Sequence, residues 1–259
     1  MNDNIIIIMA GGLGKRMESS LPKVLHEILD KPMLVHVIER SLELKPHKIL
    51  VVVGQYLPII KETLDIYGLL DKIEFVIQLE AKGTGHAIQC CKNNLISNDF
   101  NIDYSNFNVL ILSGDVPLIS KWTLEQMLID VNTVKLMVTK MEDPNGYGRI
   151  IEKDGFFEKI VEHKDCNENE LLCNKVNAGI YVFKNKYLQN YLHLLNNNNA
   201  QQEYYLTDLV EIIKVHENIN VDLYEIPQNR QIELTGINTK KQLQELNLLL
   251  KSEKDLYDR

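Results

Sequence analysis

Residues 4–17, NIIIIMAGGLGKRM, join a run of four isoleucines to a loop that contains three glycines. Consecutive isoleucines are typical of a strand that is buried on both faces of a parallel sheet. Glycines let the backbone approach a ligand closely, and the guanidinium of Arg16 suits phosphate oxygens. The stretch therefore predicts a buried strand followed by a loop that either binds a phosphate or only makes a tight turn.

Two well-known phosphate-binding loops do not fit this stretch. A P-loop needs the pattern GxxxxGK[ST], but Met9 stands at its first glycine and Arg16 follows its lysine. A dinucleotide fingerprint read from Gly12 ends in the bulky Met17, and no ribose-binding acid follows the second predicted strand. The loop belongs to neither class.

Outward from this loop, compact runs rich in isoleucine, valine and leucine recur through the first half of the chain. They predict buried strands over residues 4–10, 48–54, 73–77, 108–113 and 134–140. Residues 33–44 follow Pro32 and repeat apolar residues at helical spacing, which predicts a crossover helix. We expect an α/β fold with flanking helices and a mainly parallel sheet, with all five strands in its interior.

From about residue 143 the pattern changes to short strands separated by glycine and asparagine turns. Strands are predicted over residues 148–152, 156–162 and 176–183, and helices over residues 206–215 and 239–256. The asparagine-rich span 93–106 is interpreted as a surface insertion without function. We expect one continuous domain over residues 1–259, with a boundary between its halves near residue 142.

Composition excludes several other classes of protein. Of 259 residues, 45% are hydrophobic and 25% are charged, which is typical of a globular chain, and the net charge of −8 does not suit nucleic-acid binding. No run approaches the roughly 18 apolar residues of a membrane helix, and the first residues carry no basic group typical of a signal peptide. The four cysteines lack disulfide or CxxC spacing. We expect a cytoplasmic protein that binds neither nucleic acid nor membrane.

Further motifs follow the glycine loop in a fixed order. They are GLGKRM at residues 12–17, LPKVLH at 21–26, GTGHA at 83–87, GDVPL at 114–118, GYGRI at 146–150, EHKD at 162–165, NAGIY at 177–181 and QEYYLTD at 202–208. In order and spacing, this series resembles the sugar-1-phosphate nucleotidyltransferases, and most of all the N-terminal uridylyltransferase domain of the bacterial bifunctional GlcNAc-1-phosphate uridyltransferases.

The resemblance implies a Rossmann-like nucleotide-diphospho-sugar transferase fold. Residues 1–142 would be the nucleotide-binding half, residues 143–238 the hairpin-rich sugar-binding half, and residues 239–259 a C-terminal helix. The bacterial enzymes continue into a β-helix acetyltransferase domain, but no hexapeptide repeats are present in this sequence, so that domain is not expected. The apolar stripe of the last helix favours no oligomeric state.

The resemblance also implies a reaction. The phosphate of N-acetylglucosamine-1-phosphate attacks the α-phosphorus of UTP with Mg²⁺ as cofactor, which gives UDP-GlcNAc and releases pyrophosphate. One alternative keeps this chemistry with glucose-1-phosphate or dTTP. A second is a non-catalytic nucleotide-sugar sensor, which the presence of Arg16, Lys23 and Asp115 disfavours.

By the same resemblance, Arg16 steadies the leaving pyrophosphate and Lys23 contacts the phosphates, and both are the catalytic candidates. Gln78 would read the edge of the uracil, unless it merely ends a strand. The implied nucleotide contacts are Met9, Ala10, Gly11, Gly12, Gly14, Lys23, Gln78, Gly83, Thr84, Ser113, Gly114 and Asp115.

Asp115 and Asn238 are the implied Mg²⁺ ligands, because this ion takes one or two protein oxygens and completes its shell with substrate phosphate and water. Asp115 could instead be a turn residue, and Asn238 a helix cap. Gly148, Glu162 and Asn177 are the implied sugar contacts, although Glu162 could equally belong to a solvated charged turn.

Overall fold

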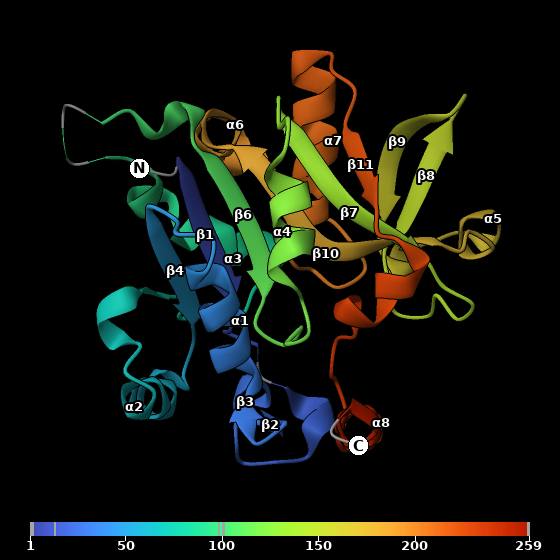
Figure 1. Ribbon diagram of the computed structural model, residues 1–259. Coiled ribbons are helices and arrows are strands. Elements are labelled where there is room, and N and C mark those ends of the chain that lie inside the picture. The colour runs from blue at the N-terminus through green and yellow to red at the C-terminus, as the bar shows by residue number, and fades with distance from the viewer. Residues whose placement is uncertain (1–2, 13, 98, 100–101, 258–259) are drawn as a thin grey trace.

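The computed structural model describes residues 3–12, 14–97, 99 and 102–257. Its main sheet has the strand order β11-β7-β10-β6-β1-β4-β5 (Figure 1). In that order the strands are Asp222–Glu225, Val134–Lys140, Lys175–Lys184, Asn108–Ser113, Asn4–Met9, Lys48–Val53 and Glu74–Ile77. β10 is antiparallel to both neighbours, whereas the other pairs in this order are parallel. The predicted α/β fold with a mainly parallel sheet is confirmed.

The second half adds a hairpin to this sheet. β8 (Arg149–Lys153) and β9 (Phe156–Val161) pair antiparallel, and β8 joins β10 where Arg149 lies opposite Val176. A small separate sheet pairs β2 (Glu27–Ile28) with β3 (Lys31–Pro32). The strands predicted after residue 143 are therefore present.

Helices cover both faces of the sheet, and the alternation of side chains along β1 shows why. Ile6 and Ile8 pack with α1 (Met33–Leu42), α2 (Leu57–Ile66) and α4 (Lys121–Leu128). Ile5 and Ile7 pack on the other face with α3 (Thr84–Cys90), α6 (Asn185–Tyr191) and α7 (Leu206–Glu217). Because successive strand residues point to opposite faces, a run of isoleucines requires a helical layer on each side.

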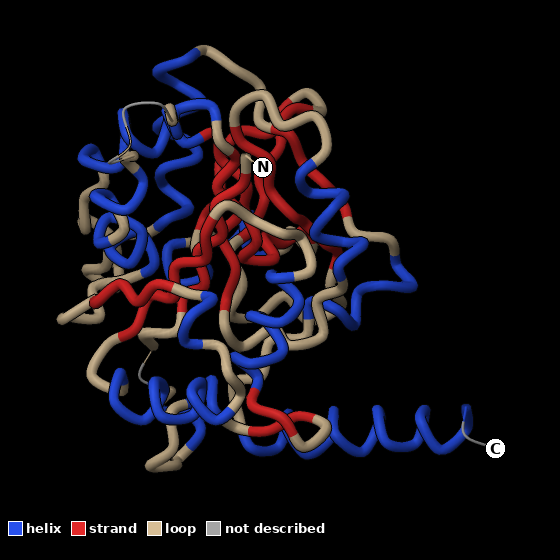
Figure 2. The backbone as a smooth tube through the Cα atoms, turned by 60° about the vertical axis from the view of Figure 1, so that its left-hand side comes forward, coloured by secondary structure: helices blue, strands red, loops and turns tan. Residues whose placement is uncertain are grey.

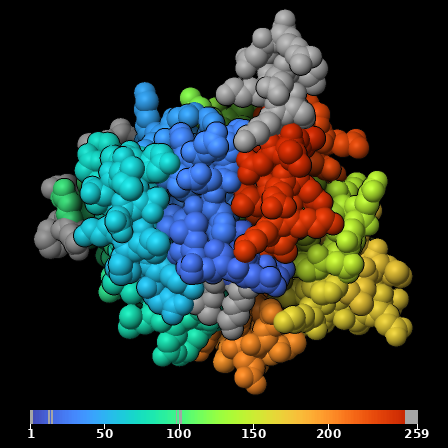
Figure 3. All heavy atoms as spheres, turned by 90° about the horizontal axis from the view of Figure 1, so that it is seen from below, coloured from blue at the N-terminus to red at the C-terminus, as the bar shows by residue number. Residues whose placement is uncertain are grey.

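The last long helix belongs to neither layer. α8 (Lys240–Tyr257) packs through Leu246 against Ile28, Met33 and Ile237, while a four-residue helix, α5 (Glu168–Leu171), follows the β8–β9 hairpin. α8 runs along the lower side of the molecule and extends past the sheet (Figure 2). Seen from below, the blue part of the chain that contains β2 and β3 lies beside the red part of α8 (Figure 3). Residues 258 and 259 of the predicted C-terminal helix lie outside the described residues.

Two expectations are wrong. β5 forms an edge of the sheet instead of an interior strand, and its Ile77 side chain is 51% exposed. The span 93–106 is not confined to the surface, because Leu95 and Tyr104 are buried and Asn185 Nδ2 donates to their carbonyl oxygens at 2.7 and 3.0 Å. Residues 98, 100 and 101 of that span lie outside the described residues.

No helix in the described part of the chain combines the length and the apolar character needed to cross a membrane. The ends of the strands determine where a ligand site can lie. The parallel strands β1, β4, β5 and β6 all end at one edge, and the antiparallel β10 begins there. In α/β sheets the carboxyl edge of the parallel strands is where ligands bind.

Candidate active site

The glycine loop leaves β1 at this edge. Ala10 N–H donates to Val52 O at 2.8 Å, and Met9 O accepts from Gly114 N–H at 3.0 Å. These two hydrogen bonds connect the end of β1 to β4 and to the residue that follows β6. A Cβ on Gly11 would lie 3.0 Å from Gln78 Oε1, whereas one on Gly12 would meet nothing within 4 Å. Gly11 therefore allows a close approach between the loop and Gln78, and Gly12 leaves the exposed side of the loop open.

Gly14 has a different task, which is to place Lys23. Its φ of +57° lies in the left-handed region, and a Cβ there would be 2.7 Å from Lys23 Cβ. Only glycine satisfies both conditions without strain. Lys23 begins the short 3₁₀ turn Lys23–Leu25, directly after Pro22. The structure thus gives Gly14 a packing role against Lys23.

Lys23, Asp115, Arg16 and Asn238 meet beyond the ends of β1 and β6. Lys23 forms an ion pair with Asp115 Oδ2, and its ammonium also donates to Asn238 Oδ1 at 3.0 Å. Arg16 donates to the same Asn238 oxygen at 3.1 Å, and Ser113 Oγ donates to Asp115 Oδ1 at 2.6 Å. Asp115 is therefore a buried, paired carboxylate rather than a turn residue in solvent.

Asn238 reaches this group because the helix after it is capped by another residue. Ile237 N–H donates to Asp115 O at 3.2 Å, which fixes the chain beside β6. Thr239 Oγ1 accepts from Gln242 N–H at 3.2 Å, and Gln242 Oε1 accepts from Thr239 N–H at 3.1 Å. This reciprocal pair is a capping box. The cap is Thr239, so the amide of Asn238 is free to face Arg16 and Lys23.

The donor set at this position fits Mg²⁺. Asp115 Oδ2 and Asn238 Oδ1 converge on one cation, the Lys23 ammonium. A carboxylate and an amide oxygen are hard donors of the kind that Mg²⁺ takes together with substrate phosphate and water. Within the described residues, no group of three or more His, Cys, Asp or Glu side chains offers a full protein cage for a metal.

Gln78 lies across the edge from this cation group. It follows β5, its N–H donates to Val53 O at 2.8 Å, and its side chain is buried. Its Nε2 donates to Gly83 O at 3.1 Å, where Gly83 has a φ of +106° and a Cβ would lie 2.5 Å from Tyr204 O. Thr84 Oγ1 accepts from Leu206 N–H at 3.1 Å. Gly83 and Thr84 therefore fix the segment before α7, and Gln78 does more than end a strand.

Gly114 is enclosed by the protein. A Cβ there would lie 3.3 Å from Leu34, Val24 and the carbonyl of Met9. Its backbone N–H is already donated to Met9 O. Of the predicted nucleotide contacts in this segment, Ser113 and Asp115 are the ones whose side chains join the polar group described above.

The predicted sugar contacts come together on the other side of β10. Asn177 N–H donates to Gly148 O at 2.9 Å, and a Cβ on Gly148 would be 3.5 Å from both Glu162 carboxylate oxygens. Glu162 Oε1 accepts from Thr207 Oγ1 at 3.0 Å. Burial raises the pKa of Glu162, and this bond partly opposes the shift. Glu162 is thus half-buried, while Lys164 beside it stays exposed.

Asn177 is buried and held by its own strand. Its Nδ2 donates to Tyr181 Oη at 2.6 Å, and its Oδ1 accepts from Gly179 N–H at 3.1 Å. Burial raises the pKa of Tyr181, so this phenol stays protonated. Asp208 lies nearby, and burial together with the charge of Glu162 raises its pKa to about 6.

Several contributors to this region were not identified from the sequence. Arg149 is 1% exposed and donates from Nη1 to Pro144 O at 2.7 Å and to Tyr147 O. Its Nη2 lies 3.3 Å from His163 Nδ1, and no described carboxylate lies within 4.0 Å of it. Arg149 therefore joins the loop before β8 to the turn after Glu162. It stands inside the GYGRI motif, which was the available signal.

Tyr147 in the same motif connects the two halves. Burial and the nearby Asp115 charge raise its pKa, whereas Arg16 lowers it. The phenol therefore interacts electrostatically with two members of the cation group, although its backbone belongs to the predicted sugar side. Thr207 in QEYYLTD and His86 in GTGHA were missed in the same way, because a motif marks a segment without saying which side chain points into the site.

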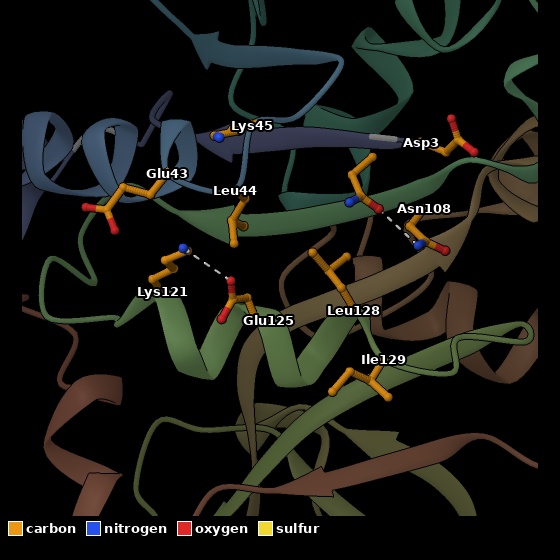
Figure 4. Close-up of a pocket in the computed structure, with 10 residues that line it drawn as sticks. Asp3, Glu43, Leu44, Lys45, Asn108, Lys121, Glu125, Leu128 and Ile129 are labelled. Atoms are coloured by element: carbon orange, nitrogen blue, oxygen red, sulfur yellow. Dashed lines mark hydrogen bonds and ion pairs between the residues drawn. The ribbon is translucent and has the colours of Figure 1, made fainter. Parts of the chain in front are cut away.

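A cavity of about 560 Å³ lies elsewhere, at the opposite edge of the sheet (Figure 4). Asn4 and Asn108, at the beginnings of β1 and β6, line it with Lys121 and Glu125 from α4. None of the predicted site residues lines it. We therefore assign the site by the convergence of side chains at the carboxyl edge rather than by cavity volume.

The fold and this arrangement define a nucleotide-binding α/β transferase, and comparison with known proteins gives its family. Residues 5–226 match the family described as nucleotidyl transferase, and the chain belongs to that family. A solved structure of a UDP-glucose pyrophosphorylase complexed with UDP-glucose superimposes with a TM-score of 0.71 at 18% identity, covering 98% of this chain and 100% of the other. At that identity the likeness concerns the fold.

Two relatives are more similar to this chain in sequence than that solved structure is. A mimivirus protein from Acanthamoeba polyphaga mimivirus, described as a probable UDP-N-acetylglucosamine pyrophosphorylase, is 40% identical over 92% of this chain and 93% of its own length. The bifunctional protein GlmU of Nitratiruptor sp. is 41% identical over 95% of this chain and 53% of its own. This chain thus spans about half the length of the bifunctional relatives and nearly all of the viral one.

Proposed function

We propose that this chain acts as a UDP-N-acetylglucosamine pyrophosphorylase with UTP and N-acetylglucosamine-1-phosphate as substrates. The observation that carries the proposal is the convergence of Arg16, Lys23, Asp115 and Asn238 at the carboxyl edge of the sheet. The viral relative and GlmU, both about 40% identical, supply the choice of substrates. The functional halves 1–142 and 143–238 are proposed on the same basis.

The reaction joins two polyanions. An oxygen of the sugar phosphate forms a bond to the α-phosphorus of UTP, the bond from that phosphorus to the bridging oxygen breaks, and pyrophosphate leaves with the electron pair. No general base is required, because the attacking oxygen is already ionised. The protein must hold the reactants in line and neutralise charge on the leaving group. Arg16 and Lys23 do so, with the backbone of residues 9–12 around the nucleotide.

Mg²⁺ is the proposed cofactor, and Asp115 and Asn238 would hold it. When bound, this ion neutralises phosphate charge and orients the phosphate chain. The Lys23 ammonium, which contacts both of these side-chain oxygens, would then pair with the phosphates instead. The ion pair with Asp115 thereby keeps the Lys23 ammonium near the phosphates that it would contact.

Gly148, Glu162 and Asn177 form the proposed sugar site. Glu162 and the carbonyl of Gly148 offer acceptors for sugar hydroxyls, and the absent side chain of Gly148 gives the ring space beside Glu162. Tyr147, which lies close to Asp115 and Arg16, would close the space between sugar and phosphates. We place the activity in the cytoplasm, in keeping with the four free cysteines.

The test is release of pyrophosphate from UTP, N-acetylglucosamine-1-phosphate and Mg²⁺, with glucose-1-phosphate and dTTP as alternative substrates. We expect selective turnover of the first pair. Asp115→Asn should lower it by roughly 10²–10³-fold. Asp65→Asn, a change at an exposed aspartate on α2, should leave it unchanged. Turnover of another pair would correct the substrate. Binding of UDP-GlcNAc without any turnover would identify the non-catalytic sensor instead.

A further inference from the structure

The side-chain amide of Gln78 is held by two acceptors. Its Nε2 lies 3.1 Å from Gly83 O and 3.2 Å from His86 Nδ1. A primary amide has two N–H donors, and these two partners use both. The Gln78 side chain is 6% exposed, so leaving either donor without a partner would carry a desolvation penalty. The amide is therefore fixed in one of its two orientations.

The contact with His86 also fixes the state of the imidazole. If Nδ1 accepts a hydrogen bond, the ring is neutral and carries its proton on Nε2. That nitrogen lies 3.9 Å from Cys90 Sγ, which is a weak acceptor. The ring packs near Tyr204, with 6.1 Å between their centroids. Cys90, Tyr204 and Gln78 thus surround the ring on three sides.

The oxygen of the amide points to the glycine loop. Gln78 Oε1 would lie 3.0 Å from a Cβ on Gly11, and among the described residues it accepts no hydrogen bond. A base seated on this loop therefore meets an acceptor and no donor from Gln78. Uracil and thymine present a ring N–H at position 3, whereas cytosine presents a bare acceptor nitrogen there.

We propose that His86 is a positioning residue that holds the Gln78 amide with its oxygen toward the base, and so selects pyrimidines with a ring N–H over cytosine. The inference rests on the proposed function and deepens it. Without His86, only the contact with Gly83 O opposes a 180° turn of the amide, which would offer Nε2 to the base and allow CTP to bind. Discrimination against CTP then depends on a residue that does not contact the nucleotide.

The experiment compares kcat/KM for UTP and CTP at fixed sugar phosphate. His86→Phe keeps a ring beside Tyr204 but removes the acceptor, and we expect the UTP to CTP ratio to fall by about tenfold or more, mainly through KM. His86→Asn restores an acceptor and should recover the ratio to within about threefold of the unmodified protein. Gln89→Leu removes a neighbouring α3 contact to Leu192 O and should leave the ratio unchanged.

Loss of activity by the same factor with both nucleotides in His86→Phe would overturn the proposal, because it would show a purely structural role. The tautomer offers an independent test if that variant does not fold. Nitrogen-15 NMR of the unmodified protein should show neutral His86 protonated on Nε2, and a proton on Nδ1 would overturn the inference. If the unmodified protein releases no pyrophosphate from either nucleotide, the proposed function fails. Binding of UDP against CDP to the unmodified protein and His86→Phe then decides the role of His86.

Discussion

The two ends of the candidate site are built on different principles. At the phosphate end, Arg16, Lys23 and Asp115 are charged groups on turns. Lys23 pairs with Asp115, 92 residues away in the chain, and Arg16 and Lys23 both donate to Asn238. At the sugar end, Asn177 is buried and Glu162 is half-buried. Each forms a hydrogen bond with a neutral partner, which is Thr207 for Glu162 and Tyr181 for Asn177.

This difference indicates how each end treats its ligand. In the proposed reaction, the ion pair between Lys23 and Asp115 would be rearranged, because the Lys23 ammonium would pair with phosphate and the Asp115 carboxylate with Mg²⁺. The hydrogen bonds at the sugar end join Glu162 and Asn177 to neutral partners within the protein, so little would have to move there when a sugar binds. The phosphate end would thus contribute mostly to catalysis, and the sugar end mostly to recognition.

The largest effect is expected at the phosphate end. Asp115→Asn keeps the shape of the side chain and removes its charge, and we expect pyrophosphate release to fall by roughly 10²–10³-fold, the range for losing one preorganised electrostatic group. Affinity for UTP without Mg²⁺ should not fall, because Lys23 loses its competing carboxylate. Weaker metal-free binding would show that Asp115 acts only by holding the fold.

A smaller loss should follow from displacing Lys23 without changing any charge. Gly14→Ala places a Cβ 2.7 Å from Lys23 Cβ at a φ of +57°, and we expect kcat/KM for UTP to fall about tenfold together with a loss of about 1–2 kcal/mol in unfolding free energy. Gly68→Ala is the matched control, since it has a φ of +63° and nothing within 4 Å. It should share the destabilisation and keep the activity. Equal activity losses in both variants would contradict the placement of Lys23 by Gly14.

Glu162→Gln tests the sugar end. The amide keeps an acceptor for Thr207 but removes the carboxylate, so we expect KM for the sugar phosphate to rise about five- to tenfold, equivalent to roughly 1 kcal/mol. KM for UTP and the turnover number should change little in steady-state assays. The exposed Glu168→Gln serves as the control. A fall in turnover larger than the rise in KM would place Glu162 in the chemistry instead.

The smallest effect concerns stability and pH. The pKa of Asp208 rises from 3.8 to about 6 on folding, so the native protein binds this proton more tightly than the unfolded chain. Its contribution to stability is present below about pH 3.8 and is lost as pH rises through about 6. Asp208→Asn should therefore stabilise the protein at pH 7.5, by about 1 kcal/mol given the partial exposure, and by less at pH 4. Denaturant unfolding at both pH values measures this, and an equal effect at the two values would refute the assignment.

The first half of the fold was predictable because its strands are continuous apolar runs. Ile5 to Ile8 must be buried on both faces, and that fact alone requires helices on both sides. The edge position of β5 was not predictable, because the short run around Val76 resembles an interior strand and only strand order reveals its missing neighbour. The same limit applies to Leu95, whose burial depends on the distant Asn185.

The residues of the candidate site also divide into those that could be predicted from the sequence and those that could not. Arg16, Lys23 and Asp115 lie in motifs that can be recognised from the sequence, and the structure brings these three together with Asn238. The supporting residues were not recognisable, because Arg149 and His86 act through carbonyl oxygens and ring nitrogens whose positions depend on the folded backbone. The local sequence also left Asn238 open as either a metal ligand or a helix cap, and the contacts of Thr239 show that Thr239 is the cap instead.

The position of Asn238 affects the order in which the site is completed during synthesis. Arg16 and Asn238 are separated by 222 residues, and at ribosomal rates of about 5–20 residues per second the second leaves the ribosome roughly 10–40 s after the first. During this interval β1, β4, β5 and β6 can already pair, so a nascent chain can hold Lys23 and Asp115 before the Asn238 amide that joins Lys23 to Arg16 has been made. Both proposed metal ligands are therefore present only after residues 237–239 have been made, so the phosphate end is the part of the candidate site that is completed last.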